Sequence, residues 1–261
     1  MNKPNQEVYN YSFYVRISEW SSKSAQVIIP IIIELAHPRS VVDVGCGDGA
    51  WLSVFHKLGV TDLLGIDGDH VTKDILRILP ENFISQDLNH PISLDRRFDV
   101  AICLEVAEHL NASSAETLVA SLTNLSDILI FSAAIPFQPG DRHINLQWPE
   151  YWISLFSQRG FSVINSLKYR IWNEPNVAFY YKQNILMFVN SWIINESDSI
   201  RCEYEKYKDL PISVVHPELF ILLTKKISKL SIEQPFVHIL YSRLRRRLKG
   251  LIALLRDGDR I

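Results

Sequence analysis

A glycine-rich turn between an apolar strand and a helix constrains the fold more than any other feature of this sequence. The stretch VVDVGCGDGAW, residues 41–51, carries Asp43 near the end of a predicted strand, followed by Gly45, Gly47 and Gly49. Glycine has no Cβ and adopts positive φ readily, so the backbone of such a turn can approach a bound ligand closely. The turn therefore indicates a nucleotide-type binding loop at the carboxyl end of a strand.

Short apolar runs alternate with amphipathic stretches around this turn, which is typical of parallel strands joined by crossover helices in an α/β fold. The predicted strands cover residues 40–44, 63–66, 83–85, 98–103, 128–132, 161–168 and 184–189. The predicted helices cover residues 22–36, 50–58 and 115–125, the last opened by a Ser113–Glu116 capping box. The segment between the last two strands shows no helical period, which favours an antiparallel hairpin at one sheet edge.

These elements divide the chain into three expected parts. Residues 1–39 form an N-terminal lid or helix, residues 40–190 the α/β core, and residues 191–261 a helical C-terminal extension with breaks near Pro211 and Pro235. The N-terminus lacks the order of charges and apolar residues of a signal peptide, and no transmembrane segment is expected.

Charge and cysteine usage limit the classes of partner and compartment. Residues 225–261 contain ten Lys and Arg against three Asp and Glu, which leaves 17 basic against 26 acidic residues in the rest of the chain. A main cleft that binds nucleic acid is therefore not expected. Only three cysteines are present in 261 residues, a usage that suits a reducing compartment, and we expect the protein to be cytoplasmic.

The spacing of the glycines indicates which ligand the loop binds. Dinucleotide-binding loops read G-x-G-x-x-G and receive a pyrophosphate, whereas this loop reads G-x-G-x-G with an acid two residues before its first glycine. An acid beside the loop repels phosphate and suits a cationic ligand. The Asp-x-Gly-x-Gly-x-Gly run resembles the first motif of class I S-adenosylmethionine (SAM) dependent methyltransferases.

That resemblance implies a Rossmann-like, doubly wound and mostly parallel seven-stranded sheet, and it implies a set of SAM-binding residues. Asp67 stands where the family places the carboxylate that holds the ribose hydroxyls, and Asp87 where an acid meets the adenine amino group. The run FDVAICLEVAEHL, residues 98–110, resembles the family's fourth-strand motif. The implied cofactor-binding residues are Asp43, Gly45, Cys46, Gly47, Gly49, Asp67, Gly68, Asp87, Leu88, Leu104 and Glu105.

A second set of residues suggests how the acceptor is activated. Glu105, Glu108 and His109 share one face if the chain turns helical after the fourth strand, and His143 lies in a polar loop after the fifth. Two carboxylates and two imidazoles suit a divalent metal such as Mg²⁺ or Mn²⁺, which would make a bound hydroxyl more acidic. The pattern resembles the metal site of small-RNA 3′-terminal 2′-O-methyltransferases. Without a metal, His143 is the expected general base, with Glu150 in reserve.

The acceptor is less constrained than the donor. Trp148 and Trp152 follow the loop of His143, and they either stack on a sugar or other planar group or anchor the next helix in the core. We expect an O-methyltransferase that acts on a small-molecule or glycan-type acceptor. The alternatives are a metal-dependent methyltransferase of an RNA 3′ terminus and a SAM-binding protein without turnover.

The C-terminal stretch VHILYSRLRRRLKGLIALL, residues 237–255, mixes apolar residues with five basic ones. A helix of this kind contacts an anionic membrane peripherally, pairs with a second subunit in a homodimer, or presents a solvated basic face. The sequence leaves these three interpretations open.

Overall fold

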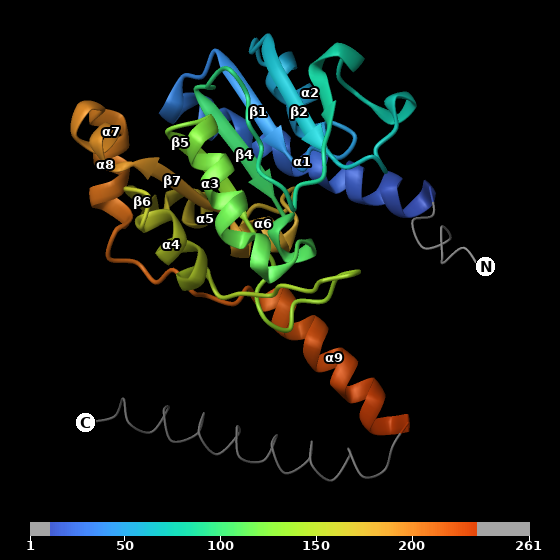
Figure 1. Cartoon of the computed structure of the whole chain (residues 1–261). Helices are drawn as coiled ribbons and strands as arrows, with labels where there is room; N and C mark the ends of the chain where they lie inside the picture. Colours follow the sequence, from blue (N-terminus) through green and yellow to red (C-terminus); the bar gives the residue numbers. More distant parts are fainter. Residues whose placement is uncertain (1–10, 234–261) are drawn as a thin grey trace, which may run out of the picture. The chain divides into compact units, whose positions relative to one another are not determined.

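The structure is a computed structural model that describes the backbone of residues 11–233 and the side chains of residues 19–228 (Figure 1). Two compact units can be distinguished in the chain, with the division after Val214. The predicted basic helix over 237–255 lies outside the described residues. Among the described residues, no helix is both long enough and apolar enough to pass through a bilayer.

A seven-stranded sheet forms the centre of the first unit, which confirms the predicted α/β fold. The strands are β1 (Ser40–Val44), β2 (Asp62–Asp67), β3 (Phe83–Ser85), β4 (Val100–Leu104), β5 (Ile128–Ser132), β6 (Phe161–Ile164) and β7 (Leu186–Asn190). Their order across the sheet is β3-β2-β1-β4-β5-β7-β6. The first five strands pair in parallel, whereas β7 runs antiparallel to both β5 and β6. The antiparallel edge hairpin is therefore confirmed.

Helices cover both faces of this sheet because its central strands are apolar on both sides. Every residue of β1, β4 and β5 is buried. Successive residues such as Val41 and Val42 belong to hydrophobic cores on opposite faces of the sheet. One face is covered by α1 (Tyr11–Ala36), α2 (Ala50–Lys57), α5 (Ser166–Ile171), α6 (Phe179–Asn184) and α8 (Asp198–Tyr207). The other is covered by α3 (Ala115–Leu125) and α4 (Pro149–Ser157). The carboxyl ends of the five parallel strands lie at one edge of the sheet.

The connection between β6 and β7 differs from the prediction. The strand expected over 161–168 ends at Ile164, and two short helices, α5 and α6, occupy the segment that shows no helical period. Leu167 and Ile171 are both fully buried, four residues apart on α5. This one-turn repeat is too short to stand out in the sequence, so tertiary packing determines these helices.

Two helix N-termini also differ from expectation. Helix α1 begins at Tyr11 rather than near residue 22. Helix α3 has the predicted bounds but not the predicted capping box, because Ser114 precedes it and makes no side-chain cap. The Ser114 hydroxyl donates instead to Asn89 Oδ1, at 3.2 Å.

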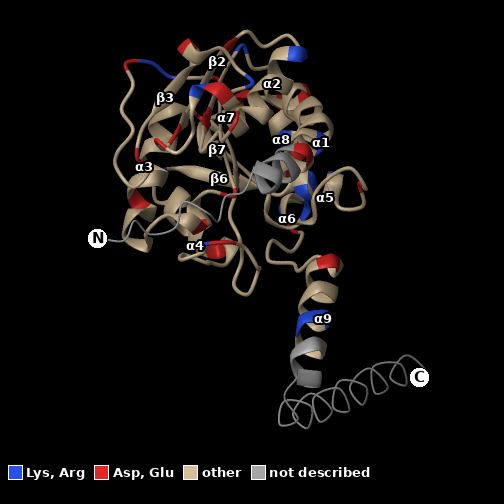
Figure 2. Cartoon of the chain, turned by 90° about the vertical axis from the view of Figure 1, so that its right-hand side faces the viewer, with Lys and Arg blue, Asp and Glu red and all other residues tan. Residues whose placement is uncertain are grey.

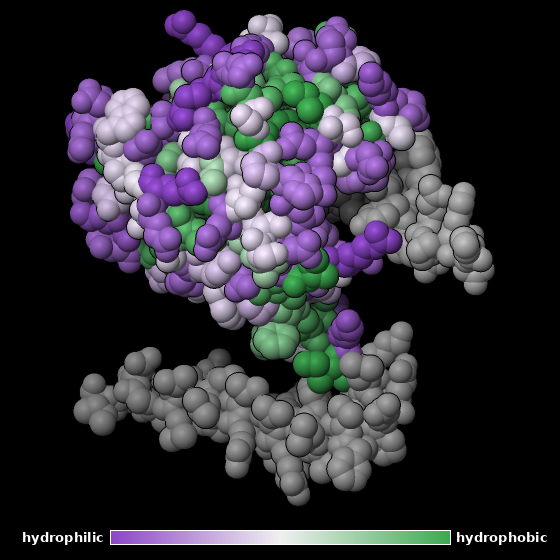
Figure 3. Space-filling view, in the orientation of Figure 1, coloured by the Kyte–Doolittle hydropathy of each residue, from purple (hydrophilic) through white to green (hydrophobic). Residues whose placement is uncertain are grey.

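The second unit is described through α9 (Pro217–Glu233). Phe220, Ile221, Leu222 and Ile227 are all exposed on this helix, which shows green in Figure 3. Lys225 and Lys226 add a band of positive charge, blue in Figure 2. The helix therefore combines apolar and basic surface. In the first unit, α7 (Ser191–Glu196) follows β7 along the chain and packs on β7 and α8.

Candidate active site

The glycine turn leaves β1 at Val44 and enters α2 at Ala50. Gly45, Gly47 and Gly49 have φ values of 86°, 52° and 78°, a region that other residues adopt only with strain. A Cβ on Gly45 would lie 2.2 Å from Val106 Cγ2, so this position also has no room for a side chain. The turn thus requires glycine for conformational and for steric reasons.

Asp67 contacts this turn directly at the carboxyl end of β2. Its Oδ2 accepts a hydrogen bond from Gly47 N at 2.7 Å, and its Oδ1 accepts one from Gly68 N at 2.7 Å. Asp43, on the neighbouring strand, is also buried, and burial raises its pKa well above the usual value, with further contributions from the charges of Asp67 and Asp48. The structure thus brings together Asp43 and Asp67, two acids of the predicted cofactor site, on neighbouring strands.

The residues after β3 lie at the same edge, because Ser85 pairs with Asp67 in register. Asp87 is exposed, and its Oδ1 accepts hydrogen bonds from Asn89 N and Nδ2 at 2.9 and 3.0 Å. These two hydrogen bonds lower the pKa of Asp87. Leu88 turns the other way and is buried. An exposed acid and a buried apolar residue thus follow the strand.

Glu105 follows β4 with a left-handed backbone, φ 55°. Its carboxylate accepts hydrogen bonds from Gln138 Nε2 at 3.0 Å and from Asn184 Nδ2 at 2.9 Å. Gln183 completes the network by donating to both amide oxygens, Gln138 Oε1 and Asn184 Oδ1. Burial raises the pKa of Glu105, while these amide donors oppose the shift. No spacing in the sequence pointed to this amide network, whose members come from three separate segments.

Glu108 has the opposite environment, although it is only three residues further along the chain. It is 0% exposed, and neither of its carboxylate oxygens has a hydrogen-bond partner among the described residues. Burial raises its pKa well above the usual value, and the nearby charge of Glu105 raises it further. A buried carboxyl group without partners is costly, and it indicates a group that a ligand completes.

Two imidazoles approach this carboxyl group. One ligand atom from each of Glu108, His109 and His143 can be chosen so that all three lie within 4.8 Å of one another. The two rings meet edge to face, with their centroids 4.9 Å apart, and the buried Nδ1 of His143 has no hydrogen-bond partner among residues 19–228. Burial lowers the pKa of both histidines, which favours the neutral, ligating form. We refer to these three residues as the Glu-His-His cluster.

The cluster contains three of the four expected metal ligands. The prediction placed Glu105 on the same helical face, but the chain forms only a 3-10 turn over Ala107–His109, and Glu105 precedes it with a left-handed backbone. Its carboxylate therefore points to the amides rather than to the histidines. The backbone nitrogens of Ile144 and Asn145 donate to Glu108 O at 2.8 and 3.0 Å, which fixes the His143 loop on this turn.

The loop from β5 to α4 combines backbone strain with exposed apolar side chains. Phe137 and Arg142 have φ values of 69° and 52°, and with Glu105 they account for three of the four positive-φ residues other than glycine in the described chain. Phe137, Ile144 and Trp148 are 81%, 62% and 44% exposed. Strained backbone and exposed apolar groups are both common at binding sites. We call these three side chains the apolar rim.

Trp152 and Glu150, two further residues that the sequence suggested for the acceptor site, have different environments. Trp152 is buried and packs against Phe131, so it anchors α4 in the core. Glu150 is exposed and accepts a hydrogen bond from Ser213 Oγ at 2.7 Å. It is not among the residues that gather around His143.

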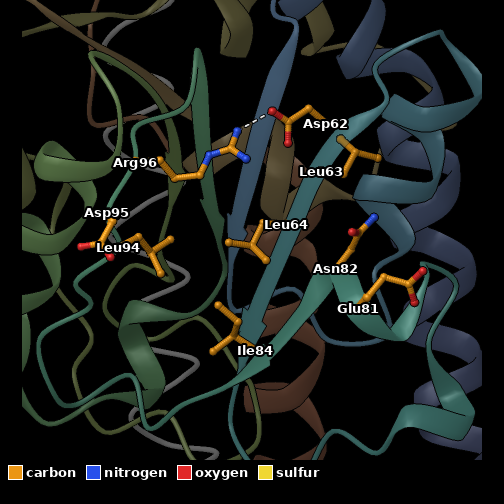
Figure 4. Close-up of a pocket in the computed structure, with 9 residues that line it drawn as sticks. All are labelled: Asp62, Leu63, Leu64, Glu81, Asn82, Ile84, Leu94, Asp95 and Arg96. Atoms are coloured by element: carbon orange, nitrogen blue, oxygen red, sulfur yellow. Dashed lines mark hydrogen bonds and ion pairs between the residues drawn. The ribbon is translucent and has the colours of Figure 1, made fainter.

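A cavity of about 410 Å³ lies elsewhere, against β2 and β3 (Figure 4). Leu64, Ile84 and Leu94 line its floor, and the Asp62–Arg96 ion pair crosses its rim. Asp62 begins β2, whereas Asp67 ends it, so this hollow lies toward the opposite end of the strand from the glycine turn.

Comparison with known proteins places the chain among methyltransferases. A family model described as a methyltransferase domain matches residues 20–166, more than half of the chain. No curated protein matches it.

Several solved structures share the fold. DesVI from Streptomyces venezuelae is 14% identical with a TM-score of 0.51, over 68% of this chain and 95% of that one. SAM-bound CalS10 from Micromonospora echinaspora, an amino pentose methyltransferase, is 14% identical with a TM-score of 0.50, over 73% and 99%. A putative O-methyltransferase from Nostoc punctiforme is 15% identical with a TM-score of 0.50, over 69% and 61%.

Proposed function

Because the chain belongs to the methyltransferase-domain family, we propose that it transfers a methyl group from SAM to a hydroxyl oxygen of a small-molecule or glycan-type acceptor. One observation carries the cofactor assignment: the Asp67 carboxylate and the glycine turn are joined by a hydrogen bond at the carboxyl edge of the sheet. A carboxylate held in this way is preorganised to accept hydrogen bonds from two vicinal hydroxyls, such as those of ribose.

The other residues of this edge suit the rest of the cofactor. SAM supplies an activated methyl group on a sulfonium, next to an ammonium group. Asp43 lies in β1 just before the turn, and Glu105 follows the neighbouring strand β4. These two carboxyl groups favour such a cationic ligand electrostatically. Asp87 and Leu88 offer an acceptor for the adenine amino group and an apolar contact. The chain's main contribution to the reaction is to align the acceptor with the methyl group.

The Glu-His-His cluster fits a divalent metal such as Mg²⁺ or Mn²⁺. A carboxylate oxygen and two neutral imidazole nitrogens are suitable ligands, and the unpartnered oxygens of Glu108 are the observation that favours an ion. A metal at this place would lower the pKa of an acceptor hydroxyl. In its absence, His143 is the proposed general base, since its lowered pKa keeps it neutral at pH 7.

The apolar rim favours an acceptor with an apolar or planar part beside its hydroxyl group. Phe137 directly precedes Gln138, which belongs to the amide network around Glu105. Ile144 directly follows His143, which belongs to the Glu-His-His cluster. A polyanion such as RNA would meet the carboxyl groups of this edge and few exposed cations. A phenyl glycoside, which joins a planar ring to a sugar diol, is therefore the first acceptor to test.

Calorimetry with SAM, followed by a methyl-release assay, tests the proposal. We expect Asp67→Ala to weaken SAM binding about tenfold, because buried ribose hydroxyls lose their acceptor. Transfer to phenyl β-glucoside that is lost in excess chelator and restored by Mn²⁺ would support the metal. SAM binding without transfer to any of a broad set of acceptors would indicate a binding protein. Transfer to an RNA 3′ terminus, with steep salt dependence, would indicate an RNA enzyme.

We further propose a cytoplasmic protein that contacts an anionic membrane surface through its second unit. The cysteines of the chain are free thiols, which supports a reducing compartment. The exposed apolar side chains of α9 and the excess of basic residues over 225–261 favour anionic lipid. Sedimentation with phosphatidylglycerol vesicles, but not with phosphatidylcholine vesicles, is the expected result; a homodimer without vesicle binding would contradict it.

A further inference from the structure

The connection between β2 and β3 packs on the glycine turn. It contains two 3-10 turns, Lys73–Ile75 and Pro80–Asn82, and no longer helix. Ile78 lies so close to the turn that a Cβ on Gly49 would come within 3.2 Å of its side chain. The segment is therefore placed to act on the turn that binds the cofactor.

Arg77 makes polar contacts from this segment to the glycine turn and to α1. Its backbone N donates to Asp48 O at 2.8 Å, and its Nε donates to Asp48 Oδ2 at 2.8 Å. Its Nη1 donates to Ser22 Oγ on α1 at 2.9 Å. One guanidinium group thus joins the glycine turn to the N-terminal helix.

Asp48 is the residue of the turn that receives this cation. It lies between Gly47 and Gly49, and its Oδ1 accepts a hydrogen bond from Ala50 N at 3.1 Å, at the start of α2. Its neighbour Gly47 is the residue that donates to Asp67. A displacement of Asp48 would therefore also move Gly47, and with it the hydrogen bond to the proposed ribose-binding carboxylate of Asp67.

Charge gives the contact a second role. Asp43, Asp48 and Asp67 all lie in or beside the turn, and the methionine end of SAM carries a carboxylate in addition to its ammonium group. Without a nearby cation, the charge of Asp48 would repel the carboxylate of SAM. The ion pair with Arg77 neutralises the charge of Asp48. We propose that Arg77 is a positioning residue that neutralises Asp48, holds the glycine turn against α1 and so sets the affinity for the cofactor. The inference rests on the proposed SAM site.

Calorimetry with S-adenosylhomocysteine (SAH), the demethylated product, tests this role without an acceptor. We expect Arg77→Ala to weaken SAH binding about fivefold, within the range of a partly exposed ion pair. Arg77→Lys should retain most of the affinity because it keeps the charge, and Ser22→Ala should cost about twofold. The control is Arg96→Ala, which removes the ion pair to Asp62 near the opposite end of β2. Arg96 and Arg77 are similarly exposed, whereas Asp62 is more exposed than Asp48. The SAH affinity of this variant should equal that of the wild type.

A second substitution separates neutralisation from a general loss of structure. Asp48→Asn in the Arg77→Ala background removes the uncompensated charge and keeps a side-chain oxygen for Ala50 N, so SAH affinity should recover by at least twofold. An Arg77→Ala variant that binds SAH like the wild type, or a double variant that shows no recovery, overturns the inference. A wild-type protein that binds neither SAM nor SAH overturns the proposed function itself.

Discussion

Glu105 and Glu108 are three residues apart beyond the end of one strand, and burial raises the pKa of both, yet their carboxyl groups differ in their hydrogen-bond partners. Glu105 accepts hydrogen bonds from two side-chain amides, which a third amide orients. Glu108 is completely buried, and within the part of the chain that the structure describes neither of its carboxylate oxygens has a hydrogen-bond partner. Since folded proteins satisfy almost all their buried polar groups, the first environment is complete and the second is not.

From this difference we infer that Glu105 has a structural role in addition to the one proposed for it at the cofactor site, whereas the role of Glu108 is to bind a ligand. The amide network fixes Glu105 and, through Gln138, the beginning of the loop from β5 to α4. The Glu-His-His cluster contains buried polar atoms without partners among the described residues, and we expect it to destabilise the folded state until a ligand binds. We therefore expect the residues that bind the proposed ligand to lower the free energy of unfolding when no ligand is bound. Variants of these residues can test this when unfolding and activity are measured on the same protein.

The largest expected effect is on turnover. His143→Ala should lower methyl release at least 100-fold, because it removes either a metal ligand or the general base. SAM affinity should stay within twofold of the wild type, since the glycine turn and Asp67 are unchanged. His56→Ala, on the exposed surface of α2, is the control. Retained activity in the His143 variant would remove the cluster from the proposed mechanism.

Glu105→Met should destabilise the protein by roughly 2 kcal/mol. Methionine has a similar volume but cannot accept the hydrogen bonds of the two amides. Gln138 Nε2 would lose its acceptor in the interior, and Asn184 Nδ2 would keep only its bond to Gln138 Oε1. Urea unfolding monitored by circular dichroism measures the change. An unchanged midpoint would show that the network is not structural.

Lys168 extends the comparison to a buried charge outside the site. It is 0% exposed, donates to Ile212 O at 2.5 Å, and burial lowers its pKa to about 8, which the nearby Glu150 charge opposes. The unfolded chain binds this proton up to a pKa of about 10.4, so unfolding takes up a proton between these values and stability rises with pH across that window. Across this window the free energy of unfolding should rise by roughly 3 kcal/mol, and Lys168→Met should abolish this pH dependence. Equal pH profiles for the two proteins would contradict the lowered pKa.

The sequence was a good guide to the parts of this molecule that depend on neighbouring residues. Residues 41–51 predicted the strand, the turn and the helix together, because the alternation of glycines is a local requirement of the backbone. The carboxyl ends of parallel strands meet at one edge, so the contact between the glycine turn and Asp67 also followed from the order of the strands.

The acceptor side was less predictable because it depends on contacts between distant segments. The i, i+3, i+4 spacing of Glu105, Glu108 and His109 suggested one common face, but this requires a helix directly after β4. The left-handed backbone of Glu105 prevents it, and the amides that hold Glu105 lie 33 and 79 residues away in the chain. Similarly, α5 and α6 depend on packing against the sheet rather than on their own sequence.

Glu108→Met provides the matched counterpart of Glu105→Met, with the smallest expected effect and the opposite sign. In chelated protein the substitution removes a buried carboxyl group without partners, so the free energy of unfolding should rise by about 1 kcal/mol. The same variant should lose the metal-dependent part of its activity. Glu116→Met, at an exposed position of α3, controls for the substitution itself. If Glu108→Met destabilised the protein as Glu105→Met is expected to do, the two carboxyl groups would have the same structural role, and the case for a ligand at the cluster would be lost.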